Sequence, residues 1–200
     1  MNENESFQKK SRFISLFLAI LLVVFQTVSC YAYTGFTNTP LRGQERCYWC
    51  WAACAQMLLE TQGIYFTQTQ IAGGLTSASA SETLDRLQAC APNIQWDYHN
   101  YALGMDSVVN TINSGWAILV ILFKTGVDNG HDMVITGYKR ETGQYDQVWL
   151  QDPWGSNSYP DGGIEDWCDY VALMDGNYDH YSYNGSFVSW LGYKWTASIC

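Results

Sequence analysis

The spacing of apolar residues changes along the chain, from a helical period in the first half to strand-like runs in the second. Apolar residues that recur every three or four positions indicate helices. In the first such segment Trp51 and Cys54 fall on one side, and Gly63 ends the run. Ser79 with Glu82 three residues later is typical of a helix start with a capping box. The pattern predicts helices over residues 50–60, 67–72, 79–90 and 105–113.

The second half has the pattern of a sheet. Residues 116–123 form an apolar run rich in β-branched side chains, which is typical of a buried strand. The polar segment 140–146 contains Gly143 and is expected to join two strands in a hairpin. Strands are predicted over residues 116–123, 133–139, 148–151 and 187–195, with a loop-like tail before the last. The fold class is therefore α+β, with a helical N-terminal half and an antiparallel sheet in the C-terminal half.

The first 32 residues have the pattern of a signal peptide. Lys9, Lys10 and Arg12 precede an uncharged apolar run over 13–25, which is too short to span a bilayer comfortably. Cleavage is expected after Ala32, so residues 1–32 are the leader and 33–200 one domain. An uncleaved anchor is one alternative. Lipid attachment at Cys30 is another, although Thr27 stands where a lipoprotein signal has an aliphatic residue.

Charge restricts the classes of partner. The leader carries two acidic and three basic residues, so its removal changes the net charge from −9 to −10. An acidic surface argues against nucleic acid and against anionic membranes as partners. Few charges and many aromatic residues suit an exported protein, and we expect a secreted or periplasmic location. Export favours paired cysteines, and Cys168 with Cys200 is one expected disulfide.

Cys50 is the strongest candidate for a nucleophile. It opens the first predicted helix, where free backbone N–H groups and the helix dipole favour a thiolate. A base must take the thiol proton, and the chain has three histidines. His99 and His180 lie in polar segments, whereas His131 begins a predicted strand. A strand fixes the backbone of a histidine, so His131 is the candidate base.

Asp152 is the candidate that orients this base. It ends the next predicted strand, in the segment Asp-Pro-Trp-Gly. If the strands of His131 and Asp152 pair as a hairpin, the two side chains meet near its open end. The carboxylate would then bind one ring nitrogen and leave the other for Cys50. A plain turn at Asp-Pro is the alternative. Trp154 is expected to cover this contact from water.

The chain resembles the papain-like cysteine peptidases. In that family a Gln stands six residues before the nucleophilic Cys, and a Trp follows the Cys. The catalytic His is followed six and seven residues later by Gly-Tyr, and the third residue lies in Asn-Ser-Trp-Gly. The matching positions, in the right order, are Gln44, Cys50, Trp51, His131, Gly137, Tyr138 and the segment 152–155.

The chain also departs from the family pattern. Asp152 replaces the family's Asn, which looks closer to compact bacterial branches with a Cys-His-Asp triad, namely bacteriocin-leader peptidases and papain-like effector proteases of plant pathogens. Tyr48 and Trp49 replace the family's glycines before the nucleophile. The resemblance implies that Gln44 and the backbone N–H of Cys50 donate to the oxyanion. It also implies a disulfide between Cys47 and a cysteine about forty residues later, which is Cys90.

The resemblance implies a secreted endopeptidase that acts through a thioester. Acyl transfer on the same residues, of a transglutaminase or cell-wall amidase type, is one alternative, and an inactive disulfide-stabilised binding module is another. The Cys47-x-x-Cys50 spacing also occurs in zinc and redox sites. A zinc site needs two more closely spaced ligands, which the sequence does not offer. A thioredoxin-like redox site needs a strand before the motif, and the polar segment there does not predict one. We therefore expect no metal and no cofactor.

The expected partner is a peptide or protein substrate. Residues 33–43 are too few for an inhibitory pro-domain, so a separate proteinaceous inhibitor is one way to restrain the activity. Nucleic acid is not an expected partner. Contact with a membrane is expected only if a lipid is attached at Cys30. The protein is expected to be a monomer.

Overall fold

The computed structural model describes residues 32–127, 130–154, 162–181 and 187–200. Residues 33–200 form one compact unit. The predicted leader, except for Ala32, lies outside the described residues. No helix among the described ranges has the length and apolar character needed to cross a bilayer.

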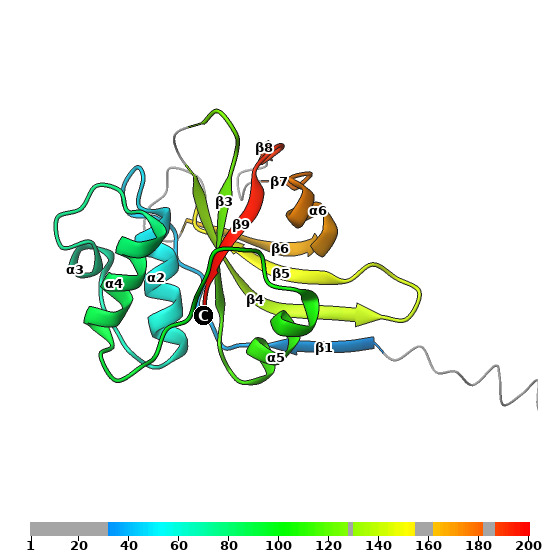
Figure 1. Cartoon of the computed structure of the whole chain (residues 1–200), viewed down its shortest axis with the longest axis horizontal. Coiled ribbons are helices and arrows are strands. Elements are labelled where there is room, and N and C mark those ends of the chain that lie inside the picture. Colours follow the sequence, from blue (N-terminus) through cyan, green and yellow to red (C-terminus); the bar gives the residue numbers. More distant parts are fainter. Residues whose placement is uncertain (1–31, 128–129, 155–161, 182–186) are drawn as a thin grey trace, which may run out of the picture. The chain divides into compact units, whose positions relative to one another are not determined.

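Helices dominate the first half, as predicted (Figure 1). Thr67 and Ser79 each cap a helix with a complete capping box, so the local sequence determines where these helices begin. Of the helices in the described ranges, the longest begins at Cys50. The bounds are α2 Cys50–Thr61, α3 Gln68–Ala72, α4 Ala80–Cys90, α5 Met105–Asn113 and α6 Tyr170–Asp175.

The strands form one antiparallel sheet with the order β2-β9-β3-β4-β5-β6, and β1 pairs with β4 outside this path. The strands β7 and β8 pair with each other in a separate antiparallel two-stranded sheet. The bounds are β1 Ala32–Phe36, β2 Tyr98–His99, β3 Ile118–Phe123, β4 His131–Glu141, β5 Gln147–Asp152, β6 Ile164–Asp169, β7 Asp179–Tyr181, β8 Phe187–Ser189 and β9 Lys194–Ile199.

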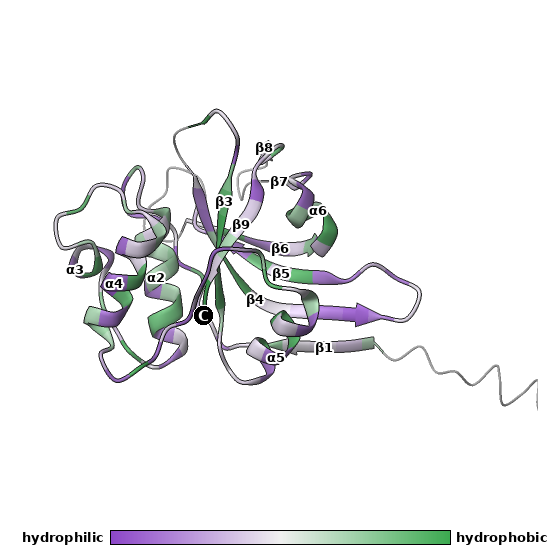
Figure 2. Cartoon of the chain, in the orientation of Figure 1, coloured by the Kyte–Doolittle hydropathy of each residue, from purple (hydrophilic) through white to green (hydrophobic). Residues whose placement is uncertain are grey.

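The sheet has a buried core on each of its two faces. Leu119 and Val134 face the core that contains α2, α3 and α4. Their strand neighbours, such as Val120 and Met133, face a second core with α5 and Leu173 of α6. Successive side chains of a strand point to opposite faces, so a strand buried on both sides is apolar at consecutive positions. Figure 2 shows this hydropathy in β3 and in the central parts of β4 and β5, whose far ends are hydrophilic.

These observations confirm the α+β fold class, with helices first and an antiparallel sheet second, as in a papain-like fold. The tail differs from the prediction. A strand and a helix, β6 and α6, occupy 164–175, which was expected to be a loop. The last long strand is β9 at 194–199, later than predicted. Both strands owe their existence to pairing with β5 and β3, which the local sequence does not encode.

The two predicted disulfides do not form, since all six described cysteines are free. Cys168 lies on β6 and Cys200 follows β9, with β3, β4 and β5 between them. Four strand spacings amount to roughly 19 Å, whereas a disulfide requires Cα atoms within about 7 Å. Cys90 ends α4, about 15 Å along the helix from Ala80. Ala80 lines the same cleft as Cys50, which lies three residues after Cys47. Cys90 is at the opposite end of α4 from Ala80 and does not line this cleft.

Candidate active site

The first turn of α2 presents Cys50. The helix begins at this residue, and its N-cap, Trp49, makes no side-chain cap hydrogen bond. The first N–H groups of a helix have no intrahelical partner, so the N–H of Cys50 is available to a ligand. The indole of Trp49 is fixed by a hydrogen bond to the carbonyl of Leu75 and by the guanidinium of Arg46 above its ring. The start of the helix is thus anchored from the side.

Tyr48 turns the chain into this helix. It has φ of 64° and is the one non-glycine residue with positive φ in the described part of the chain. Such a backbone conformation costs roughly 1–2 kcal/mol for a residue with a Cβ. The papain-like peptidases have a glycine at this position, and the chain keeps the glycine-like conformation without the glycine. Strained residues of this kind are common at functional sites.

His131 and Asp152 meet as predicted. His131 begins β4 and Asp152 ends the adjacent antiparallel strand β5. Nε2 of His131 lies 2.6 Å from Oδ1 of Asp152. The two residues are 3% and 1% exposed, so water competes little for this contact.

Among the described residues, the backbone of Trp154 and the indole of Trp190 also hold the Asp152 carboxylate. Its Oδ1 accepts a hydrogen bond of 2.7 Å from the backbone N–H of Trp154. Its Oδ2 accepts one of 3.0 Å from the indole N–H of Trp190. The Trp190 ring also stacks on the His131 imidazole, with ring centres 4.0 Å apart and planes 6° apart. Trp190 therefore fixes both members of the pair.

The predicted role of Trp154 is thus carried mainly by another residue. Trp154 remains 49% exposed and approaches His131 edge-on, with ring centres 6.2 Å apart. Trp190 shields the imidazole face instead. Nothing in the sequence distinguishes Trp190 from the other tryptophans, because its position depends on the path between β8 and β9.

The pKa of His131 is about 10, above its ordinary value of 6.5. Burial lowers this pKa, but the negative charge of Asp152, its hydrogen bond and the Cys50 side chain together outweigh burial. The imidazole is therefore positively charged at neutral pH. With Nε2 directed to Asp152, the other ring nitrogen remains for the thiol.

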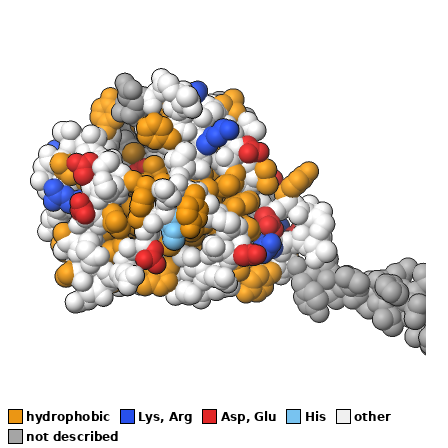
Figure 3. Space-filling view, in the orientation of Figure 1, with side chains coloured by type: hydrophobic (Ala, Val, Ile, Leu, Met, Phe, Trp, Pro, Cys, Tyr) orange, Lys and Arg blue, Asp and Glu red, His pale blue; other side chains and the backbone are white. Residues whose placement is uncertain are grey.

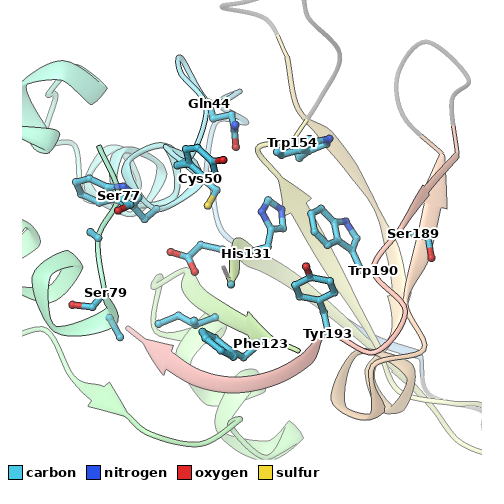
Figure 4. Close-up of a pocket in the computed structure, with 17 residues that line it drawn as sticks. Gln44, Cys50, Ser77, Ser79, Phe123, His131, Trp154, Ser189, Trp190 and Tyr193 are labelled. Carbon is cyan, nitrogen blue, oxygen red and sulfur yellow. The ribbon is translucent and has the colours of Figure 1, made fainter. Parts of the chain in front are cut away.

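A cleft of about 660 Å³ joins these side chains. Figure 4 shows the sulfur of Cys50 directed toward the His131 ring, with Trp154 and Trp190 beyond it. The walls come from α2, from the segment entering α4, from β3 and β4, and from the segment before β9. The lining residues are Gln44, Tyr48, Cys50, Trp51, Ser77, Ala78, Ser79, Ala80, Ile121, Phe123, Gly130, His131, Asp132, Trp154, Ser189, Trp190 and Tyr193.

Gln44 lies in the same cleft, on the side of Cys50 (Figure 4). Its backbone N–H donates to the carbonyl of Pro153, which ties it to the end of β5. Its side-chain nitrogen donates to the carbonyl of Arg46 at 3.2 Å, while Oε1 is buried without a partner. One N–H of the amide is thus engaged and a second remains.

The other candidate residues lie elsewhere. His99 is on β2, which pairs with β9, and does not line the cleft. His180 is on β7. Cys47 is exposed and lines a separate small pocket with Thr69 and Leu75. The described residues contain no group of three or more His, Cys, Asp or Glu side chains placed to hold a metal.

The comparison with known families agrees with this geometry. The model of the Peptidase_C39 like family matches residues 36–182, which is well over half of the chain, so the chain belongs to that family. The matched span includes Cys50, His131 and Asp152. The expectation of a cysteine-peptidase family is thereby confirmed at the level of the family. No curated protein sequence matches the chain.

Proposed function

We propose that this member of the Peptidase_C39 like family hydrolyses peptide bonds, with Cys50 as the nucleophile, His131 as the proton carrier and Asp152 as the residue that orients His131. The observation that carries the proposal is the buried 2.6 Å contact between His131 and Asp152, in the same cleft as the Cys50 sulfur. A structural ion pair would not need a thiol at a helix start beside it. The family match supports the same chemistry.

The reaction follows from the charges of these groups. The thiolate of Cys50 attacks the carbonyl carbon of the peptide bond and forms a tetrahedral intermediate. The C–N bond then breaks as the charged imidazole gives its proton to the leaving amine. The acyl group remains as a thioester on Cys50. Water attacks the thioester and gives a proton to His131, and the C–S bond breaks to release the acid and the thiolate.

The negative oxygen of the intermediate needs hydrogen-bond donors. The N–H of Cys50, at the uncapped start of α2, is one candidate. The second N–H of the Gln44 amide is the other, because only one is engaged by Arg46. Loss of one such donor typically lowers kcat by about 10²- to 10³-fold. Gln44→Ala should therefore lower kcat more than it raises KM.

The experiment that tests the proposal compares variants on a mixture of unrelated peptides, with products identified by mass spectrometry. We expect Cys50→Ala to abolish cleavage and His131→Ala to lower it by about 10²- to 10⁴-fold. Asp152→Ala should leave a remnant. Circular dichroism of each variant should remain that of the wild type. His99→Ala is the matched control, because His99 lies outside the cleft, and it should cleave normally.

The same assay separates the alternatives. With a primary amine added, an acyl transferase gives amine adducts in place of cut peptides. A binding module gives neither product. Cleavage by His131→Ala at the wild-type rate would contradict the proposed mechanism.

A further inference from the structure

Asp132 is an acidic residue of the cleft that the proposed reaction does not use. It follows His131 on β4, and neighbouring strand residues point to opposite faces. His131 shares its face with Asp152, whereas Asp132 shares its face with Val134, toward α2. Its charge contributes, after burial, to a raised pKa of Cys54 on α2. The carboxylate therefore lies beside the second turn of α2, one turn from Cys50.

Asp132 is a mostly buried residue whose carboxylate has no hydrogen-bond partner among the described residues. The residue is only 8% exposed, yet it makes no hydrogen bond and no salt bridge with any described residue. Among the described residues, the charge that acts on its pKa is that of His131. Burial raises its pKa to about 7, against which the charge of His131 acts. A mostly buried carboxylate without a partner is costly, so natural proteins normally pair such groups. A free one that lines a cleft points to a partner that arrives with the ligand.

No cation of the described chain neutralises this group. The lining of the cleft contains no Lys or Arg among the described residues. The positive charge of His131 is already balanced by Asp152 at 2.6 Å. Lys124 follows Phe123, but its ammonium donates to the carbonyl of Leu191 and lies over the Tyr193 ring. Among the described residues, no other side chain of the cleft therefore supplies Asp132 with a cation of its own.

The walls around Asp132 suit a long aliphatic stem. Ile121 is its cross-strand neighbour on β3, and Phe123 lies two residues further on the same face. Ala78 and Ala80 add further apolar lining to the same cleft. Lys and Arg bury their methylene groups along apolar surface while the charged end finds a polar partner. A pocket with apolar walls and a carboxylate at its floor matches that chemistry.

We propose that Asp132 selects peptides that carry a Lys or Arg side chain close to the cleaved bond. This rests on the proposed peptidase function. Residues four apart on a helix are about 6 Å apart, and an extended peptide advances about 3.3 Å per residue. A carboxylate beside Cys54 is therefore reached by a side chain within about two residues of the bond that Cys50 attacks. Asp132 thereby sets specificity and takes no part in proton transfer.

The test uses pairs of peptides that differ in charge but not in shape. Each internally quenched peptide carries one Arg, or citrulline at the same position, and the position is moved along an otherwise uncharged sequence. At one position within two residues of the cut, we expect kcat/KM to be at least about tenfold higher for Arg than for citrulline. Asp132→Asn should remove this preference and leave cleavage of the citrulline peptide near the wild-type rate. Asp132→Glu should retain part of it.

Asp85→Asn is the matched control, because Asp85 is exposed on α4 and does not line the cleft. It removes the same charge and should leave the preference intact. Equal wild-type rates for Arg and citrulline at every position would overturn the proposal. So would a preference that survives in Asp132→Asn.

Binding separates this inference from the proposed function. Fluorescence polarisation with Cys50→Ala measures peptide affinity without turnover. If the wild type cuts nothing, but Cys50→Ala binds the Arg peptide at least about tenfold more tightly than the citrulline peptide, the peptidase proposal fails and the cationic pocket stands. In that case the Cys50→Ala, Asp132→Asn double variant should bind the Arg and citrulline peptides with equal affinity. Equal affinities for both peptides contradict the pocket itself.

Discussion

Asp152 determines the state of the imidazole at the scale of single residues. It accepts hydrogen bonds from His131, from the backbone of Trp154 and from the indole of Trp190. A buried carboxylate with three donors cannot turn without losing several charge-assisted hydrogen bonds. The stacked Trp190 ring fixes the plane of the imidazole at the same time. Asp152 therefore sets the charge of His131 and, together with Trp190, its orientation.

The pH dependence of activity should reveal this dependence on Asp152. Asp152 holds the pKa of His131 at about 10, while burial alone would lower it below 6.5. In Asp152→Asn the charge is lost and burial remains, so His131 should lose its proton at a lower pH. We expect the alkaline limb of kcat/KM against pH to move down by at least about two pH units. The measurement is a pH profile of peptide cleavage.

The control for that profile is Asp166→Asn on β6, which removes an exposed carboxylate and should leave the alkaline limb in place. An Asp152→Asn profile that coincides with the wild type would show that the carboxylate does not govern His131.

Single residues differ in how far the sequence predicts them. The spacing around Gln44, Cys50, His131 and Asp152 resembles a known family. The structure places Gln44, Cys50 and His131 on the lining of one cleft, with Asp152 bound to His131. Trp190 and Asp132 were not predicted to be part of this cleft. The contacts of Trp190 depend on a segment near β9 that reaches back to β5. The burial of Asp132 depends on α2, which no local pattern around β4 encodes.

At the scale of elements, the start of α2 is the structure on which the proposed chemistry depends. The helix begins at Cys50 without a side-chain cap, after a residue with positive φ. A side-chain cap would accept from the N–H of the second or third helical residue, so the N–H of Cys50 is free for the proposed oxyanion. The left-handed turn at Tyr48 and the fixed ring of Trp49 take the place of a cap in directing the chain into the helix.

Replacement of Tyr48 by Gly tests whether that turn is strained. Glycine adopts φ of 64° without a Cβ clash, so we expect Tyr48→Gly to raise the free energy of unfolding by about 1 kcal/mol. Urea unfolding of both proteins measures the difference. Tyr48→Ala is the control, because it removes the ring and keeps the Cβ, and it should not be stabilised. A Gly variant no more stable than the Ala variant would contradict the strain.

Elements with local signals were predicted most closely. The helix over 105–113 has its predicted bounds, and the capping boxes at Thr67 and Ser79 mark α3 and α4. Their hydrogen bonds lie within a few residues of chain. The tail was predicted poorly, because β6 and β9 are defined by strands that lie far away in sequence. Short polar strands of this kind have no periodicity of their own.

At the scale of the whole molecule, the sheet separates two cores and the cleft lies where both contribute. Cys50 is the first residue of α2, which packs in one core, whereas strand alternation places His131 on the same face of β4 as Met133 in the other core. Neither core alone would assemble the site. Charged side chains are scattered singly or in small groups on the face shown in Figure 3, without a broad patch of either sign.

The central claim is that Cys50 and His131 act as one unit, and alkylation of the cysteines across pH 4 to 8 tests it most directly. Iodoacetamide labels thiolates, and an ordinary thiol is almost fully protonated at pH 5. Mass mapping should show Cys50 labelled at least about tenfold faster than the exposed Cys47 at pH 5. His131→Ala should remove that advantage. Parallel loss of labelling at Cys50 and Cys47 as the pH falls, in the wild type, would contradict the account.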